Sequence, residues 1–357
     1  MHLPKPPSLL AVLTAVAVFP AAGAAPVRWN DALVQPPAWY ASAEALRVAD
    51  NVLSYQTPEG GWPKNVDMAR EPLAPQGVPH PHETNTIDNG ATWTQLTYLA
   101  RVYERTPEPR FQAAFERGLD YLFAAQYPNG GWPQYFPRRE GYYSHVTFND
   151  GAMISVMTLL RDVAGARPPY RFVDAGRRAR AGDAVARGIE CILRCQVRID
   201  GTLTVWCAQH DEHTLAPAPA RRFEPVTLSG GESAGIVRFL MQEEQPSAAV
   251  IEAVRAAVAW FEAVKLTGLR FERVTTPSGP DATVAADPAA GPLWARFYEI
   301  GTNRPVFTGR DAVVRYRLAG IERERRGGYA WYGTWPEKVL RDFPEWEKRV
   351  SGGHPAR

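Results

Sequence analysis

Two short polar clusters place an acidic side chain next to an amide side chain. Asp88 and Asn89 form the first pair, Asn149 and Asp150 form the second, and a glycine follows each pair. Each pair offers two hard oxygens, and Ca2+ prefers several such oxygens from different loops. Alternatively, each aspartate caps the helix that follows, a position that Asp and Asn favour. Both pairs occupy the same position of an internal repeat, and this coincidence favours a site.

A third cluster, towards the C-terminus, is rich in arginine. Arg296, Arg304 and Arg310 lie within 15 residues of one another, among aromatic and turn-forming residues. Planar guanidinium groups bind carboxylates with two parallel hydrogen bonds, so this segment predicts recognition of anionic groups. The alternative is that Arg310 and Asp311 start a helix and that the arginine forms an ordinary surface ion pair.

Other familiar chemistry is not indicated. The segment His210-Asp211-Glu212-His213 lacks the helical i, i+4 histidine spacing of zinc proteases, so we expect mostly surface residues there. The chain has no Gly-rich phosphate loop and no Gly-x-Ser-x-Gly turn, which argues against nucleotide chemistry and serine hydrolysis. A formal net charge of +2 favours neither nucleic acid nor an anionic membrane as a partner.

A repeat of about 70 residues positions the polar clusters. The phrase Gln-x3-Gly-Gly-Trp-Pro occurs at residues 56–63 and again at 126–133, and a looser copy spans 196–206. Each copy follows an apolar helical stretch and precedes a polar cluster that opens another helix; the third cluster is Gly230-Gly231-Glu232. A unit of this length suits a helical hairpin with a long loop. We therefore expect three hairpins in a ring, with their loops on one face.

The tryptophans of the repeat allow two interpretations. Trp62 and Trp132 either wedge their loops against helix ends or contact a sugar directly. The chain has 11 Trp and 14 Tyr, which is a weak indication of carbohydrate binding because sugars stack on aromatic rings. Helical periodicity dominates elsewhere, and the best strand candidates are 269–274 and 296–300. The connections 57–89, 127–149 and 197–231 are long enough to favour a functional role.

The N-terminus predicts export. Lys5 precedes an apolar run over residues 9–20, and small residues follow at 21–25. This is typical of a secretory signal peptide, so we expect a signal over 1–25 and a single mature domain over 26–357, located in the periplasm or outside the cell. Cys191, Cys195 and Cys207 are interpreted as buried thiols, although a disulfide between Cys195 and Cys207 is possible.

Several motifs together resemble polysaccharide lyase family 10, the pectate lyases, over residues 39–342. They are Gly-Gly-Trp62-Pro-Lys64-Asn65, Ile-Asp88-Asn89-Gly-Ala-Thr, Phe-Asn149-Asp150-Gly-Ala-Met and Phe-Tyr-Glu-Ile-Gly-Thr-Asn303-Arg304-Pro. The resemblance implies a mainly α fold, an (α/α) toroid of three helical hairpins with long loops and a few short strands. It also implies Ca2+-assisted β-elimination of polygalacturonate to 4,5-unsaturated oligogalacturonides, by a monomer.

The resemblance also implies roles for particular residues. Arg310 matches the arginine that abstracts the C5 proton, and Arg296 matches an arginine that holds substrate. Asp88, Asn89 and Asp150 match the calcium and acidic substrate positions. Lys64, Arg221 and Arg304 lie in matching motifs and are assigned to substrate binding.

An arginine base is demanding, because a free guanidinium keeps its proton above about pH 12. We therefore expect Arg310 to be buried among other cations, which would favour its neutral form. The third repeat departs from the family pattern, because Gly230-Gly231-Glu232 replaces the Asp/Asn pair. This predicts a structural or binding role for the third hairpin and leaves the number of calcium ligands open.

Two other functions fit parts of the pattern. A hydrolase on a related helical toroid could use Asp88 and Asp150 as acid and base. A carbohydrate-binding protein without turnover would need only the aromatic loops. The arginines around Arg310 favour the lyase, because a hydrolase has no need of a cationic base.

Overall fold

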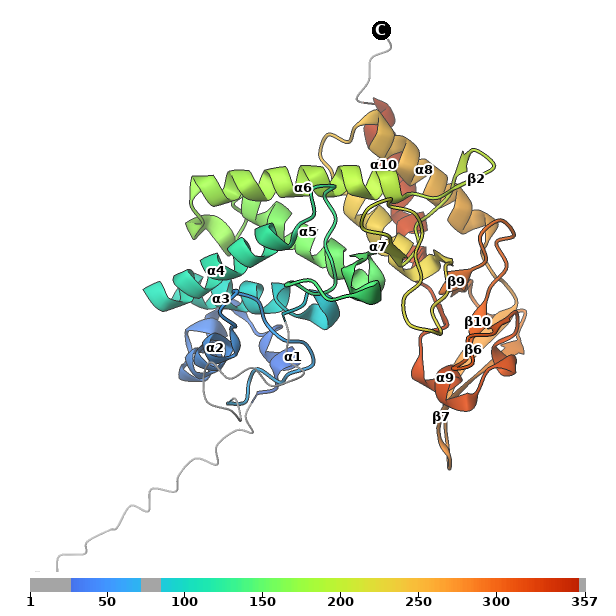
Figure 1. Ribbon diagram of the computed structural model, residues 1–357, viewed down its shortest axis with the longest axis horizontal. Coiled ribbons are helices and arrows are strands. Elements are labelled where there is room, and N and C mark those ends of the chain that lie inside the picture. Colours follow the sequence, from blue (N-terminus) through green and yellow to red (C-terminus); the bar gives the residue numbers. More distant parts are fainter. Residues whose placement is uncertain (1–26, 72–84, 353–357) are drawn as a thin grey trace, which may run out of the picture.

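The computed structural model describes residues 27–71 and 85–352, so the expected signal peptide lies outside the described residues. Figure 1 shows helices stacked over most of the molecule and a smaller strand-containing lobe beside them. The α-helices are α1 (Trp29–Ala32), α2 (Ala43–Tyr55), α3 (Trp93–Arg105), α4 (Pro109–Ala125), α5 (Ala152–Ala164), α6 (Ala175–Cys195), α7 (Gly230–Leu240), α8 (Ala248–Ala263), α9 (Arg323–Gly328) and α10 (Glu337–Gly352). The 3-10 helices are η1 (Pro37–Ala41), η2 (Asp88–Gly90), η3 (Gly141–Ser144), η4 (Asn149–Gly151), η5 (Tyr170–Phe172) and η6 (Leu318–Gly320).

The strands are short and pair only in twos within the described residues. They are β1 (Val146–Thr147), β2 (Arg198–Ile199), β3 (Thr202–Leu203), β4 (Gln209–His210), β5 (Leu228–Ser229), β6 (Leu269–Thr276), β7 (Gly279–Ala286), β8 (Trp294–Ala295), β9 (Phe297–Tyr298), β10 (Phe307–Thr308), β11 (Val314–Arg315) and β12 (Tyr332–Gly333). All six pairs are antiparallel: β1–β4, β2–β3, β5–β9, β6–β7, β8–β12 and β10–β11. No sheet closes on itself in this part of the chain.

The predicted (α/α) toroid is wrong. The hairpins follow one another in an open, two-layered series, in which α3, α5 and α7 pack in one layer and α2, α4, α6 and α8 in the other. Helix α2 packs on α3 and α4, at one end of the series, whereas α8 packs on α6, α7 and α10 at the other. The C-terminal helix α10 packs against α7 and α8 of the last hairpin. In a closed ring, the first hairpin would occupy that position.

The Gln–Trp phrase holds this series together. At each copy the tryptophan is fully buried, and its indole N–H donates to a carbonyl near the C-terminal end of the preceding helix. Those carbonyls belong to Val52, Leu122 and Ile192, at 2.7–2.8 Å from the indole nitrogens of Trp62, Trp132 and Trp206. The structure therefore supports the wedge interpretation and excludes direct sugar contact by these buried rings.

The glutamines join neighbouring helices of the outer layer. Gln56 Nε2 donates to Gly60 in its own loop and also to a carbonyl of the next outer helix, 58 residues away. The acceptors in the next helix are Ala114 in α4 for Gln56, Ala184 in α6 for Gln126 and Ala253 in α8 for Gln196. The 70-residue spacing thus reflects one contact repeated between successive outer helices.

The first position of each Gly-Gly pair has no room for a side chain. Gly60 has φ +98° and Gly130 has φ +93°, a region that side chains rarely adopt. A Cβ at either position would also collide with a carbonyl oxygen of the next outer helix, at Arg117 or Arg187. In the looser third copy, a Cβ added at Gly201 would meet no atom within 4 Å, so this steric reason does not apply there.

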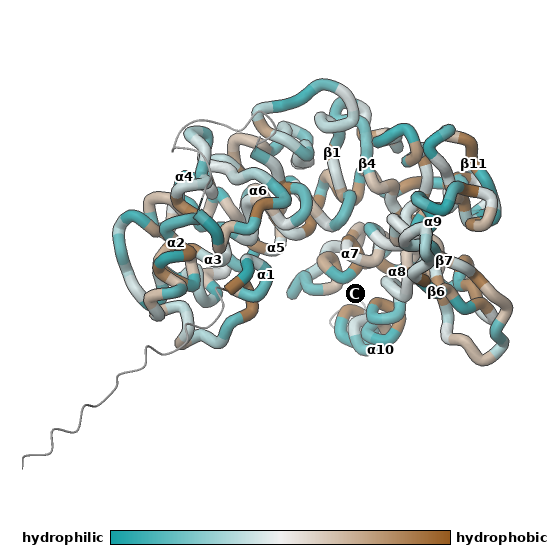
Figure 2. Tube along the Cα trace, turned by 90° about the horizontal axis from the view of Figure 1, so that it is seen from below, coloured by the Kyte–Doolittle hydropathy of each residue, from teal (hydrophilic) through white to brown (hydrophobic). Residues whose placement is uncertain are grey.

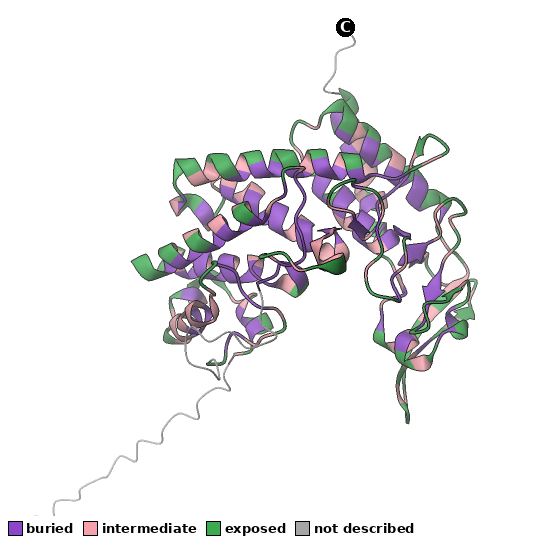
Figure 3. Ribbon diagram, viewed as in Figure 1, coloured by how far each residue is buried: buried purple, intermediate pink, exposed green. Residues whose placement is uncertain are grey.

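A fourth tryptophan repeats the contact without the phrase. Trp294 is fully buried, and its indole N–H donates to Phe261 O near the end of α8 at 2.8 Å. The main core joins these tryptophans to the helix interfaces, and burial follows the facing sides of the helices in Figure 3. A second, smaller core around Trp331 lies within the strand-containing lobe. The three cysteines are free and buried, as predicted for structural thiols.

Replacing one wedge tests this account of the repeat. We expect Trp132→Phe to lower the free energy of unfolding by roughly 2–3 kcal/mol, because it leaves a cavity and removes the indole donor from a buried carbonyl. Urea denaturation measures this, with Trp39→Phe at a half-buried ring as the control. An unchanged stability combined with weaker binding of substrate would instead indicate a sugar-contacting ring.

Candidate active site

The first polar pair forms a strained turn ahead of α3. Asn89 has φ 50°, in the left-handed region that Asn tolerates, and Asp88 is 4% exposed. No side-chain hydrogen bond caps α3, so the capping interpretation of Asp88 is wrong. Instead, Asp88 Oδ2 accepts hydrogen bonds from Lys64 Nζ and from Gln134 Nε2, the latter at 2.6 Å.

Lys64 and Gln134 occupy equivalent positions of the two exact repeat copies. Each lies two residues after the buried tryptophan of its copy, and both side chains reach the same carboxylate. Burial alone would lower the pKa of Lys64, but its hydrogen bond and charge interaction with Asp88 outweigh burial and raise that pKa. Sequence analysis did not identify Gln134, because a glutamine alone does not indicate a catalytic or binding role. Aligning the two repeat copies would have placed it opposite Lys64.

The second polar pair has the same turn with its acid shifted by one position. Asp150 has φ 50° and Gly151 is the N-cap of α5, so Asp150 does not cap that helix either. Asp150 Oδ1 accepts a hydrogen bond from Arg296 Nη2 at 2.8 Å, and Oδ2 accepts one from Asn149 Nδ2 at 2.7 Å. The left-handed position is thus Asn89 in one repeat and Asp150 in the other.

The third repeat contributes an acid after all. Glu232 lies in the first turn of α7 and is 6% exposed, and its Oε1 accepts a hydrogen bond from Arg296 Nη2 and another from the Asp150 backbone N–H. The turn η4 packs against both η2 and α7, which brings the three repeats together. Sequence analysis named the cluster Gly230-Gly231-Glu232 and predicted a structural or binding role for its hairpin, but it assigned no site role to Glu232 itself, because the cluster lacks an Asp/Asn pair.

Arg296 links this acidic cluster to the strand-containing lobe. Its side chain is 9% exposed and forms ion pairs with Asp150 and Glu232. Burial alone would lower the pKa of Arg296, but the charges of Glu232 and Asp150 outweigh burial and raise it. Arg296 therefore remains protonated and suits charge binding. On its other side, the guanidinium lies 4.7 Å from the ring centroid of Tyr329.

Three further arginines surround one phenylalanine ring, and we call Arg221, Arg310 and Arg325 the arginine group. Their guanidinium carbons lie 4.9, 5.1 and 3.9 Å from the ring centroid of Phe223. Arg325 also lies 4.9 Å from the ring of Tyr329. Arg296 and the arginine group are therefore connected through Tyr329, so the structure joins residues that the sequence spreads over more than 100 positions.

Members of the arginine group differ in the direction in which their surroundings shift their pKa values. Burial, with repulsion from Arg310 and Arg221, lowers the pKa of Arg325, whose Nε and Nη2 are buried without hydrogen-bond partners in the described residues. Arg310, in contrast, is exposed, and its Nη2 donates to Glu324 Oε1 at 2.8 Å. That hydrogen bond raises the pKa of Arg310, while the charge of Arg221 opposes the rise. Arg310 was expected to be buried among other cations. It does lie near Arg221 and Arg325, but it is exposed, so the expected burial is wrong.

The remaining predicted residues lie around this core. Arg304, before β10, places its guanidinium carbon 3.6 Å from the ring centroid of Tyr316, after β11. Arg310 lies at the opposite end of this strand pair, in the turn that connects β10 to β11. Asn89 Nδ2 donates to Asn65 Oδ1 at 2.9 Å. Both of these asparagines, with Lys64, line a pocket of about 520 Å³.

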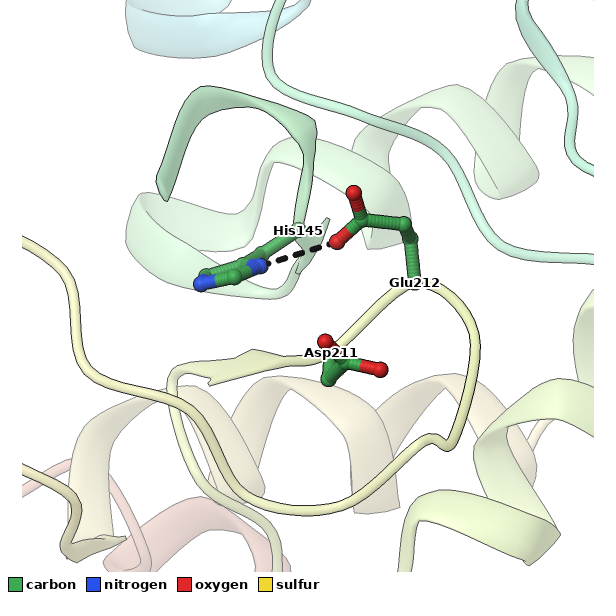
Figure 4. A group of neighbouring side chains, drawn as sticks. All are labelled: His145, Asp211 and Glu212. Carbon is green, nitrogen blue, oxygen red and sulfur yellow. Dashed lines mark hydrogen bonds and ion pairs between the residues drawn. The ribbon is translucent and has the colours of Figure 1, made fainter. Parts of the chain in front are cut away.

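The histidine-containing segment is an ion-pair cluster. His210 is fully buried and burial lowers its pKa to about 4, whereas Asp211 and Glu212 are half-buried and His213 is exposed, so the mostly-surface interpretation is wrong for His210 alone. His145 Nδ1 lies 3.0 Å from Glu212 Oε2, with Asp211 beneath them (Figure 4). Glu212 also accepts a hydrogen bond from Ser144 Oγ at 2.6 Å. These contacts tie the turn before β1 to the loop after β4, and the ligand atoms of His145, Asp211 and Glu212 lie within 4.8 Å of one another, as in a group that can hold a metal ion.

Comparison with known proteins places the chain in a class of polysaccharide-cleaving enzymes. Residues 56–340 match the family described as pectic acid lyase, and the chain belongs to this family. It is a pectate lyase of polysaccharide lyase family 10. The family 10 polysaccharide lyase from Cellvibrio cellulosa is similar at 35% identity and a TM-score of 0.78, over 89% of this chain and 95% of that one.

A point mutant of the Cellvibrio cellulosa enzyme, solved in complex with trigalacturonic acid, is also similar. It shares 35% identity and a TM-score of 0.76, over 87% of this chain and 95% of that one. No curated protein matches the chain. Among the residues that the structure describes, no helix is both long and apolar enough to cross a membrane.

Proposed function

We propose that this enzyme cleaves polygalacturonate by β-elimination, with Ca2+ bound beside the acidic cluster and an arginine as the base. The observation that carries the proposal is the continuity of acids and arginines from Asp88 to Arg310. The trigalacturonic acid complex of the similar enzyme supports a polyanionic substrate. A polyanion needs cations along its path, and a two-carboxylate hydrolase would not explain four converging arginines.

The acidic cluster supplies the negative charge that a calcium ion needs, although the one group of described acidic and histidine side chains whose ligand atoms all lie within 4.8 Å of one another is His145, Asp211 and Glu212. Asp88, Asp150 and Glu232 bring three negative charges against the two positive charges of Lys64 and Arg296, which leaves the cluster negative. Gln134 Oε1 is buried beside Asp88 without a hydrogen-bond partner, and a hard cation would satisfy it. We assign Asp88, Asn89 and Asp150 to the ion. When bound, Ca2+ supplies positive charge that stabilises the carbanion-like charge on a uronate.

The residues of this chain then divide the work. Arg296 and Lys64 hold substrate carboxylates at the edge of the acidic cluster, and Arg221 and Arg304 extend the cationic path. Arg310 removes the C5 proton once its guanidinium has separated from Glu324 and has lost a proton to solvent, so that the neutral guanidine takes up the C5 proton. Its exposed position in the β10–β11 turn allows it to reach a bound chain. The C4–O bond then breaks, the departing oxygen takes up a proton from water to become the hydroxyl of the released chain, and a 4,5 double bond remains.

One assay tests the proposed reaction against both alternatives. Incubation with polygalacturonate is expected to give near-ultraviolet absorbance from an unsaturated uronide, and a chelator is expected to abolish it. Added Ca2+ should restore the rate. Reducing ends without absorbance would indicate hydrolysis, and binding without products would indicate a carbohydrate-binding protein. We further propose that the enzyme is an exported monomer, acting where pectate is available.

A further inference from the structure

We propose that Glu224 is a positioning residue of the lyase site, which fixes the arginine group relative to Arg296. This inference rests on the proposed function, because it concerns how the same cationic path is held. Glu224 is 6% exposed and lies in the long loop between β4 and β5, where sequence analysis assigned a role to Arg221 but none to Glu224.

One carboxylate binds two partners from different segments. Glu224 Oε2 accepts a hydrogen bond from Arg221 Nε at 2.8 Å and another from the Arg221 backbone N–H at 3.2 Å. Glu224 Oε1 accepts from Arg221 Nη2 and from the Tyr329 hydroxyl, the latter at 2.8 Å. Burial alone would raise the pKa of Glu224, but the hydrogen bonds and charge of Arg221 outweigh burial and lower it. Glu224 is therefore ionised.

Both partners of Glu224 carry parts of the cationic path. Arg221 is itself a member of the arginine group, and the ring of Tyr329 lies under both Arg296 and Arg325. Glu224 thus fixes one arginine directly and two others through the ring that they share. A buried carboxylate with a bidentate arginine has a defined geometry, so it sets the spacing between charges that must match successive uronates.

A matched ion pair in the same lobe separates positioning from folding. Asp281 and Arg326 join β7 to α9 by two hydrogen bonds of 2.8 Å, and their side chains are 14% and 21% exposed. Neither residue contacts the arginine group through a hydrogen bond in the described structure. Asp281→Asn therefore removes a comparable carboxylate charge near the site but outside it.

The test compares Glu224→Gln, Tyr329→Phe and Asp281→Asn by steady-state kinetics on polygalacturonate and by thermal unfolding. We expect Glu224→Gln to lower kcat/KM about 30-fold, mostly through KM, and Tyr329→Phe about 5-fold. The double variant should be no worse than Glu224→Gln alone, because both act through one contact. Asp281→Asn should keep kcat/KM within about twofold at a similar shift in Tm.

Two results would overturn the inference. One is a Glu224→Gln enzyme within threefold of wild type. The other is an Asp281→Asn enzyme that loses as much activity as Glu224→Gln for the same shift in Tm. If Glu224→Gln does not fold, Tyr329→Phe decides alone, because it keeps the ring and removes only the hydroxyl; an unchanged KM would then refute the inference. Failure of the proposed function would appear earlier, as wild-type enzyme that releases no unsaturated product.

Discussion

Arg310→Ala is expected to remain folded and to lose about 1,000-fold in kcat, a magnitude typical of removing a general base. The side chain is exposed and lies in a turn, so its removal leaves no cavity. Arg315→Ala is the matched control, because it breaks the ion pair with Asp311 in the same hairpin without touching the arginine group. Rates are measured from the absorbance of the unsaturated product.

The pH dependence follows from the same assignment. The base must be neutral to accept a proton, so the fraction of competent enzyme rises with pH, and we expect an alkaline optimum. Because the hydrogen bond that Arg310 donates to Glu324 raises the pKa of Arg310, Glu324→Gln should shift the rising limb of the pH–rate profile to lower pH. An optimum near pH 5 would refute an arginine base. If Arg310→Ala raises only KM while Arg221→Ala loses kcat, the base is Arg221.

Asp150→Asn is expected to lower kcat/KM at least about 100-fold and to raise the Ca2+ concentration needed for half-maximal activity. The substitution removes the charge of a proposed calcium ligand and also releases one of the two anions that hold Arg296. The amide keeps the side-chain volume and tolerates the left-handed backbone at φ 50°. Calcium titration of the initial rate measures both effects.

Asp200 provides the control for that substitution. It also has a left-handed backbone, with φ 48°, but it lies in the turn between β2 and β3, away from the acidic cluster. Asp200→Asn should leave both kcat/KM and the calcium requirement unchanged. Equal calcium requirements for Asp150→Asn and wild type would show that Asp150 does not bind the ion.

Local patterns accounted for the elements but not for their closure. Apolar periodicity predicted the hairpin helices, and residues 269–274 were correctly predicted as part of a strand, now β6. The repeat predicted that hairpins would follow one another. It did not determine whether they close, because closure depends on the small rotation between successive hairpins. Here α10 packs against α7 and α8 at the end of the series.

The site shows the same division. Asp88 and Asp150 were proposed from residue type and repeat position, and Arg296 from the arginine-rich segment and the family resemblance. Arg296 forms an ion pair with Asp150, whereas Asp88 pairs with Lys64. Gln134 was missed and Glu232 was assigned no site role, because an amide and a helix-first-turn glutamate look ordinary in sequence. The burial of Arg310 was predicted wrongly, since exposure depends on packing from segments distant in the chain.

The sequence by itself determined the parts: the repeated Gln–Trp wedges, the acids that follow them and the family to which they belong. These features are local, because a helix end, a tight turn and a buried indole are specified by neighbouring residues. Tertiary structure alone decided that Glu232 faces Asp150, that Phe223 gathers three arginines and that Arg310 pairs with Glu324. Those contacts join segments up to about 100 residues apart, and their geometry arises only when the lobes pack. Figure 2 shows the outcome from below, with the repeat helices on one side, the strand-containing lobe on the other and α7 between them.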